Sequence, residues 1–253
     1  SLRPLPPQAE GDMQCRFNIS GKFSPGDVVR IDALTDDGQY HAWAEVTVPQ
    51  RPHEIADIDT VTIPMTKYYY TQNFLRYKIN IKDRSNEDNY YRLIMDKQMT
   101  VKDYNEETGE FVSRTIHRYH FISREDIVLT DGQPTNSDDE DNGMFDTVKN
   151  IYGVFDDSRF KNTSYTMTVY NQTNVEGLSK YGTNVKMDII VRLLSITETE
   201  YYYLKALNLA DSDAYDETIN EPIKYPGNVH GGIGMIGIST ETSKIIHIEK
   251  PQR

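Results

Sequence analysis

Three glycines near the C-terminus have the spacing of a dinucleotide-binding loop. The segment NVHGGIGMIGIST, residues 228–240, contains Gly232, Gly234 and Gly237 in a GxGxxG arrangement. In a dinucleotide-binding fold this motif opens a helix that binds the pyrophosphate, and an acidic residue about 20 positions later binds the ribose. Only 16 residues follow Gly237 in this chain of 253, and they alternate as a strand does. The sequence therefore favours glycines that permit bends or close backbone approach in a strand.

An acidic loop is the candidate metal site. Residues 137–146, SDDEDNGMFD, offer the carboxylate and amide oxygens that calcium prefers. In an EF-hand frame that starts at Asp138, Gly143 falls at the turn position, but Lys149 falls where a bidentate Glu is needed. A calcium site is therefore one alternative, and a solvated acidic loop is the other. The residues that would bind calcium are Asp138, Glu140, Asn142 and Asp146.

Tyrosine is in surplus, with 18 in the chain, and it is clustered in KYYYT, NYYRL and EYYYLK. Clustered aromatic rings can form a platform for sugars or a surface for a partner. Tyrosine also suits half-buried strands, because its ring is apolar and its hydroxyl can stay in water. The candidate ligand or partner surface consists of Tyr68, Tyr69, Tyr70, Tyr90 and Tyr91.

No pattern in the chain predicts catalytic residues or a cofactor other than calcium. The sequence lacks HExxH, GxSxG and the P-loop motif. His117 and His120 are three apart and would face opposite sides of a strand, so they would not share a metal. Cys15 is the single cysteine, in a strand-like run typical of a buried thiol. Carboxylate pairs that hydrolyse glycosides are defined by their separation in space, which spacing along the chain does not give.

Composition excludes several classes of protein. The formal net charge is −12, from 27 basic and 39 acidic residues, and no basic run is present, so we expect no nucleic-acid partner. No apolar run approaches the roughly 20 residues of a membrane helix, so we expect no transmembrane segment. Aromatic residues make up 11% of the chain, whereas disordered chains are poor in them.

The elements that must position these residues are mostly strands. Three short alternating segments precede residue 50, and Pro49 and Pro52 then interrupt the pattern, so we expect a boundary near 50. Longer segments with period-two patterning follow in residues 51–253. One helix is predicted near 197–209, where Thr197 is the N-cap and an apolar stripe follows.

Four stretches, in order, resemble motifs of one known family, the domain of unknown function 4249 of Bacteroidetes. They are FSPGDVVRIDA with YHAWAEVTVPQRPHEI, VFDDSRFKNTSYTMTV, VRLLSITETEYYYLKAL, and EPIKYPGNVHGGIGMIGIST. The last stretch is similar to the closing motif of the family through Glu221, Pro222, Asn228, Gly232 and Gly234. The likeness is to the C-terminal two-thirds of the sequences of this family. It gives the glycines a second interpretation, as a family signature and not a cofactor loop.

The resemblance implies a mainly β protein in two parts. Residues 1–50 would be the remnant of an immunoglobulin-like sandwich, and residues 51–253 a larger antiparallel β sandwich or barrel-like domain with one packed helix. The resemblance also implies a cell-envelope lipoprotein of the outer membrane, although Cys15 lies too deep in a strand-like run to be its lipid anchor.

The function implied is accessory to a TonB-dependent outer-membrane transporter. We expect a non-enzymatic protein that binds a glycan or peptide ligand or the transporter itself. Two alternatives stay open: a glycan-acting hydrolase with carboxylates that the sequence does not identify, and a structural or adhesion module.

Overall fold

The computed structural model describes residues 2–4, 17–19, 21–67, 70–119, 121, 126–132, 150–172, 183–212 and 221–248. The described elements are twelve strands and one helix, so the protein is mainly β, as predicted. In chain order they are β1 (Leu2–Pro4), β2 (Phe17–Ile19), β3 (Val28–Leu34), β4 (His41–Thr47), β5 (Asp57–Lys67), β6 (Tyr70–Lys82), β7 (Tyr90–Asn105), β8 (Glu110–Arg118), β9 (Val154–Asp156), β10 (Ser164–Gln172), β11 (Thr183–Ile196), α1 (Glu198–Ala210) and β12 (Thr240–Ile248).

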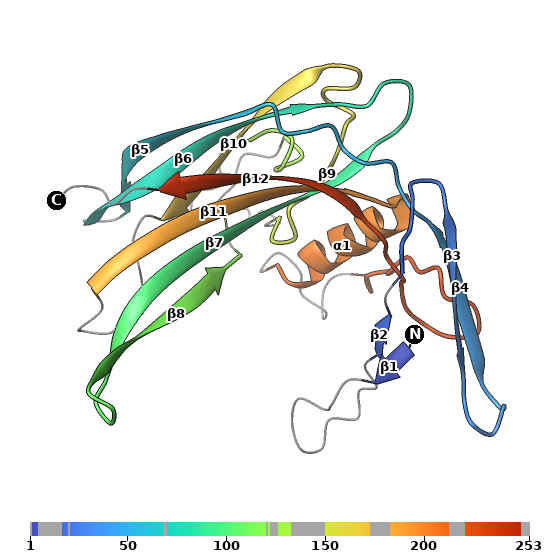
Figure 1. The fold of residues 1–253 in the computed structure, drawn as a ribbon. Helices are drawn as coiled ribbons and strands as arrows, with labels where there is room; N and C mark the ends of the chain where they lie inside the picture. The colour runs from blue at the N-terminus through green and yellow to red at the C-terminus, as the bar shows by residue number, and fades with distance from the viewer. Residues whose placement is uncertain are drawn as a thin grey trace.

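Two antiparallel sheets pack against each other and form the body of the molecule (Figure 1). The smaller sheet has the order β10-β6-β5. The larger sheet has the order β12-β11-β7-β8, and the short strand β9 also pairs with β7. In the described part of the chain both sheets stay open, so together they form a sandwich and not a closed barrel.

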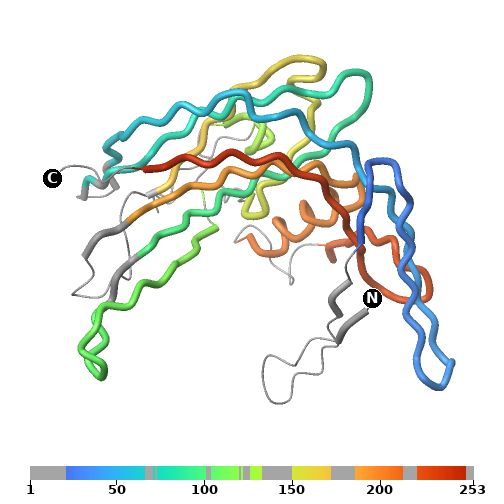
Figure 2. The backbone as a smooth tube through the Cα atoms, viewed as in Figure 1, coloured from blue at the N-terminus to red at the C-terminus, as the bar shows by residue number. Residues whose placement is uncertain are grey.

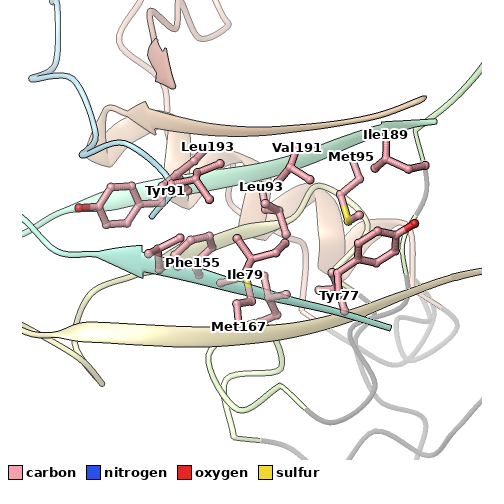
Figure 3. Packing of buried hydrophobic residues seen from close by; sticks show 14 of the residues in the cluster. Tyr77, Ile79, Tyr91, Leu93, Met95, Phe155, Met167, Ile189, Val191 and Leu193 are labelled. Carbon is pink, nitrogen blue, oxygen red and sulfur yellow. The ribbon is translucent and has the colours of Figure 1, made fainter. Parts of the chain in front are cut away.

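The core lies between the two sheets and comes from alternate residues of their long strands (Figure 3). Tyr77 and Ile79 of β6 face Leu93 and Met95 of β7, and each of these side chains is at most 1% exposed. Burying an apolar side chain of this size stabilises a fold by about 1.5–3 kcal/mol. Because side chains alternate along a strand, the neighbours of these core residues must point to the outer faces of the sheets.

Helix α1 covers part of the outer face of the larger sheet (Figure 1). Its N-cap is Thr197, as predicted, whose hydroxyl accepts a hydrogen bond from the backbone N–H of Glu200 at 3.3 Å. The helix runs from Glu198 to Ala210, one residue later at each end than the sequence indicated. Its buried side chains, Tyr201, Leu204 and Asn208, face the sheet and the β9 region.

The described residues before position 50 form two antiparallel strand pairs, β1–β2 and β3–β4. The β3–β4 hairpin projects from the body, and the segment before β12 lies beside it (Figure 2). Trp43 of β4 and His230 exchange two backbone hydrogen bonds, at 3.0 and 2.8 Å. The GxGxxG glycines belong to this segment, and a strand, β12, follows them where a dinucleotide-binding motif would open a helix.

Candidate functional site

The outer face of the larger sheet is divided into two halves. On β7, Tyr90, Arg92, Ile94, Asp96 and Gln98 alternate with core residues and therefore point outward. The half that carries the first three lies under α1, and the half that carries Asp96 and Gln98 does not. We call these the covered half and the open half.

The covered half is mainly apolar and aromatic, although it also carries Arg92. Leu194 and Ile196 of β11 pack with Val154, Tyr201 and Leu204 in a small second core. The rings of Tyr90 and Tyr201 lie 5.0 Å apart, and that spacing is typical of stabilising aromatic pairs. The side chains of α1 therefore cover this half of the sheet.

The open half carries a row of polar side chains that crosses four strands. The register places His247 of β12 opposite Asp188 of β11, Asp188 opposite Gln98 of β7, and Gln98 opposite His117 of β8. Residues directly opposite on one face have Cβ atoms about 4.5–5.5 Å apart. With Asp96, two residues before Gln98, these side chains form the polar row: His247, Asp188, Gln98, His117 and Asp96.

Contacts within the polar row join each carboxylate to a histidine. His247 Nδ1 lies 2.6 Å from Asp188 Oδ1, and His117 Nδ1 lies 3.1 Å from both carboxylate oxygens of Asp96. The Gln98 amide donates to Asp96 Oδ2 at 2.8 Å. The hydrogen bonds from His247 and Lys186 hold the pKa of Asp188 below its usual value. The row therefore combines an ionised carboxylate with imidazole and amide groups.

Accessible apolar and aromatic groups flank the polar row. The side chains of His117 and His247 are 42% and 70% exposed. Tyr119 is 62% exposed, and its ring stacks on that of His117 with centroids 6.1 Å apart. Ile245 of β12, opposite Ile190, is 55% exposed. A ligand on this face would meet planar polar groups, an aromatic ring and a small apolar surface together.

The tyrosines predicted as a ligand or partner surface do not form one patch. Tyr91 is 1% exposed and packs on Phe155, so it is a core residue; the surface role predicted for it is wrong. Its hydroxyl donates to the buried carboxylate of Asp83 at 3.0 Å. Tyr90 is partly buried, and its hydroxyl donates to Glu198 at 3.0 Å.

The other three predicted tyrosines are the consecutive residues Tyr68, Tyr69 and Tyr70. Tyr68 and Tyr69 lie outside the described residues, and for Tyr70, which begins β6, only the backbone is described. A surface role for these three stays a prediction.

The predicted calcium ligands, Asp138, Glu140, Asn142 and Asp146, also lie outside the described residues. Within the described ranges, no three His, Cys, Asp or Glu side chains come together as a metal site would require. The calcium loop therefore stays a prediction.

Among the described residues, three carboxyl groups have a raised pKa, and burial is the main cause for each: Asp126, Asp157 and Glu200. Asp126 accepts four hydrogen bonds, from the N–H groups of Val128, Leu129 and Thr168 and from the Tyr165 hydroxyl, and so holds a turn. Asp157 accepts the backbone and side-chain N–H of Asn89. Two of the three are thus structural.

Glu200 is the unusual one of the three. Its Oε2 is buried without a hydrogen-bond partner. A Cβ at Gly237 would overlap this carboxylate, so any larger residue there would require the Glu200 side chain to shift. The charge of Arg92 favours the ionised form of Glu200, whereas burial raises its pKa more strongly. Glu200 thus lies under the segment that contains the GxGxxG glycines and not on the open half.

The family model described as Domain of unknown function (DUF4249) matches residues 7–245, most of the chain. The protein belongs to the DUF4249 family. The match confirms the resemblance seen in the four sequence stretches and extends it over nearly the whole chain. Searches of curated proteins and of solved structures found no match for this DUF4249 chain. Among its described residues no helix has the length and apolar character for crossing a membrane.

Sequence reasoning missed the polar row of this DUF4249 protein. A signal was present: Asp96 and Gln98 occur in the outward positions of YYRLIMDKQMT, and Asp188 occurs in the apolar run VKMDIIVRLL. Charged residues at outward positions of a long strand mark an open face. The alignment of these polar residues across four strands depends on how the strands pair, and the sequence alone does not give that register.

Proposed function

We propose that this DUF4249 protein is a non-enzymatic binding protein of the cell envelope that binds a glycan and assists a TonB-dependent outer-membrane transporter in its uptake. The polar row on the open half of the larger sheet carries this proposal. There, polar side chains from four strands align on a single face: His117 and His247 are exposed, Asp188 is partly exposed, and Asp96 is buried beneath His117.

The chemistry of the row suits a sugar. Carboxylates, amides and imidazoles are planar groups that hydrogen-bond to pairs of hydroxyls. Charge-assisted hydrogen bonds to a carboxylate are roughly twice as strong as neutral ones. The exposed ring of Tyr119 beside His117 offers an apolar face for the C–H groups of a pyranose.

The envelope and transporter parts of the proposal rest on the family motifs. They include attachment to the outer membrane as a lipoprotein, with an anchor other than Cys15. The four matched stretches and the family match over residues 7–245 support them. A pull-down from outer-membrane extracts, read by mass spectrometry, tests this part. Enrichment of a TonB-dependent transporter is expected, and its absence would contradict it.

Binding to an array of oligosaccharides tests the ligand part. The wild type should bind a subset, and the variants His117→Ala and Asp188→Ala should bind that subset at least roughly tenfold more weakly, because each removes a hydrogen-bonding group from the row. Asp59→Ala is the matched control, since Asp59 is an exposed carboxylate on β5 of the other sheet. Selective binding of peptides in place of glycans would overturn the ligand class, and cleavage of a bound oligosaccharide would overturn the non-enzymatic role.

A further inference from the structure

Oxygen atoms from two loops converge on one side-chain nitrogen at an end of the sandwich. The loops are residues 83–89, between β6 and β7, and residues 157–163, between β9 and β10 (Figure 1). The nitrogen is Nδ2 of Asn89, and it lies 3.1, 3.0, 3.3 and 3.0 Å from Asp83 Oδ1, Arg84 O, Glu87 O and Asp157 Oδ2. We call these four oxygens the oxygen cluster.

The Asn89 amide does not satisfy the oxygen cluster. An amide nitrogen carries two N–H groups, so it can direct one hydrogen bond to each of only two acceptors. Among the described residues, Oδ1 of the same amide has no hydrogen-bond partner, although Asn89 is only 1% exposed. A buried acceptor without a partner is unfavourable. The side chain that points between the two loops therefore has an unused oxygen beside an excess of other oxygens.

The two carboxylates of the oxygen cluster lack a cation. Asp83 and Asp157 are 1% and 3% exposed, and both contact the same nitrogen. Burial raises the pKa of Asp157, and the negative charge of Asp83 raises it too. In the part of the chain that the structure describes, the nearby Arg84 and Lys161 form their ion pairs with other carboxylates of loop 83–89. Buried charges are normally paired or bound to a metal ion.

Other contacts hold the carboxylates of the cluster in place. The Tyr91 hydroxyl donates to Asp83 Oδ1 at 3.0 Å, and the N–H of Asn162 donates to Oδ2 of the same carboxylate at 2.8 Å. The N–H of Asn89 donates to Asp157 Oδ2 at 3.1 Å. The oxygens are therefore preorganised, and little freedom is lost when a ligand binds them.

We propose that the oxygen cluster, completed by Oδ1 of Asn89, binds Ca²⁺. The ion takes the position of Nδ2, and the amide turns so that Oδ1 faces the ion. The distances to the four oxygens then shorten from 3.0–3.3 Å to about 2.3–2.6 Å, and water completes a shell of about 6–8 ligands. Magnesium is disfavoured, because it needs shorter, near-octahedral contacts and keeps most of its water.

This site differs from a cluster of three acidic or histidine side chains, which the described residues lack. It needs only two carboxylates, because calcium also takes amide and backbone carbonyl oxygens. The ion would join the loop that leaves the smaller sheet after β6 to the loop that returns to it before β10. The site lies apart from the polar row, and the inference is independent of the proposed function.

Thermal unfolding of the full chain in millimolar calcium chloride and in EDTA tests the proposal. The midpoint of the wild type should be at least about 2 °C higher with calcium, because the ion binds only the folded state. Asp157→Asn keeps the shape of the side chain and removes one charge, so it should lose this shift. Asp126→Asn is the matched control and should keep it, since Asp126 is an equally buried carboxylate outside the cluster.

Asn89→Asp gives a second test, which decides if Asp157→Asn fails to fold. It places a third carboxylate in the site, so the variant should be less stable than wild type in EDTA and should gain more from calcium. If Asn89 only holds the loops together, the variant should lose stability without a larger calcium shift, and that result would overturn the proposal.

Two other results would overturn the proposal. One is a wild type whose unfolding midpoint does not respond to calcium. The other is a calcium shift that persists in Asp157→Asn and disappears in the double variant Asp138→Asn/Asp146→Asn, because the ion would then bind the acidic loop predicted from the sequence. Oligosaccharide binding by the polar row is measured separately, so neither result decides the proposed function.

Discussion

The covered and open halves of the larger sheet differ although the same strands build both. β7 changes character within two residues, from Ile94 under α1 to Asp96 in the polar row. β11 carries Leu194 at the covered end and Asp188 at the open end, with Arg192 and Ile190 at the outward positions between them. Where the outward side chains are apolar, the chain covers them with its own helix. Where they are polar, α1 does not cover them, and the face presents exposed histidines, His117 and His247, beside carboxylates that are largely buried. The difference teaches that a fold and a candidate binding surface are encoded at different positions of one strand.

The largest expected effect comes from opening the covered half. Tyr201→Ala should lower the free energy of unfolding by about 3–5 kcal/mol, because Tyr201 is 1% exposed and its hydroxyl donates to Asp156 at 2.9 Å. Urea unfolding followed by circular dichroism measures it. Tyr202→Ala is the matched control, since the adjacent Tyr202 is 49% exposed, and its loss should be far smaller. Equal losses at both positions would contradict the role of α1 as a cover.

In the open half, a substitution should weaken ligand binding strongly and change the stability of the fold only slightly. Asp188→Ala should weaken oligosaccharide binding at least roughly tenfold and change the free energy of unfolding by no more than about 1 kcal/mol, because ion pairs this exposed are worth little. Calorimetric titration and urea unfolding of the same variant measure the two. If the variant lost stability and kept binding, the row would be structural.

Glu200, which lies against Gly237 of the segment before β12, should make the stability of the covered half depend on pH. Because burial raises its pKa in the folded state, its favourable contribution is full at low pH and is lost as pH rises through the raised pKa. Glu200→Gln lacks this titration, so its stability relative to wild type should increase as pH rises above the usual pKa range of a glutamate. Urea unfolding of both proteins from that range upward measures it. A difference that is constant with pH would show that Glu200 is not perturbed.

The smallest effect is expected at the edge of the open half. Ile245→Ser should change the free energy of unfolding by less than about 0.5 kcal/mol, because Ile245 is 55% exposed. The thermal unfolding midpoint measures it. A large loss would mean that another part of the chain covers this edge.

Local patterns predicted much of the fold and little of the site. Thr197 marked the start of α1 because capping is a short-range interaction, and period-two patterning marked the strands because it reflects burial on one face. The clustering of Tyr90 with Tyr91 was misleading: adjacent residues on a strand point to opposite faces, and Tyr91 is in the core. The polar row joins His117 to Asp188 and His247 through a strand register that no local pattern states.

The central claim is that the open half binds a ligand and the covered half does not. The most direct test is a titration of isotope-labelled protein with the oligosaccharide that binds best on the array, followed by backbone chemical shifts. We predict the largest shifts at Gln98, His117, Asp188 and His247, with α1 unchanged. Shifts confined to α1 or to the β10-β6-β5 sheet would contradict the assignment of the binding face.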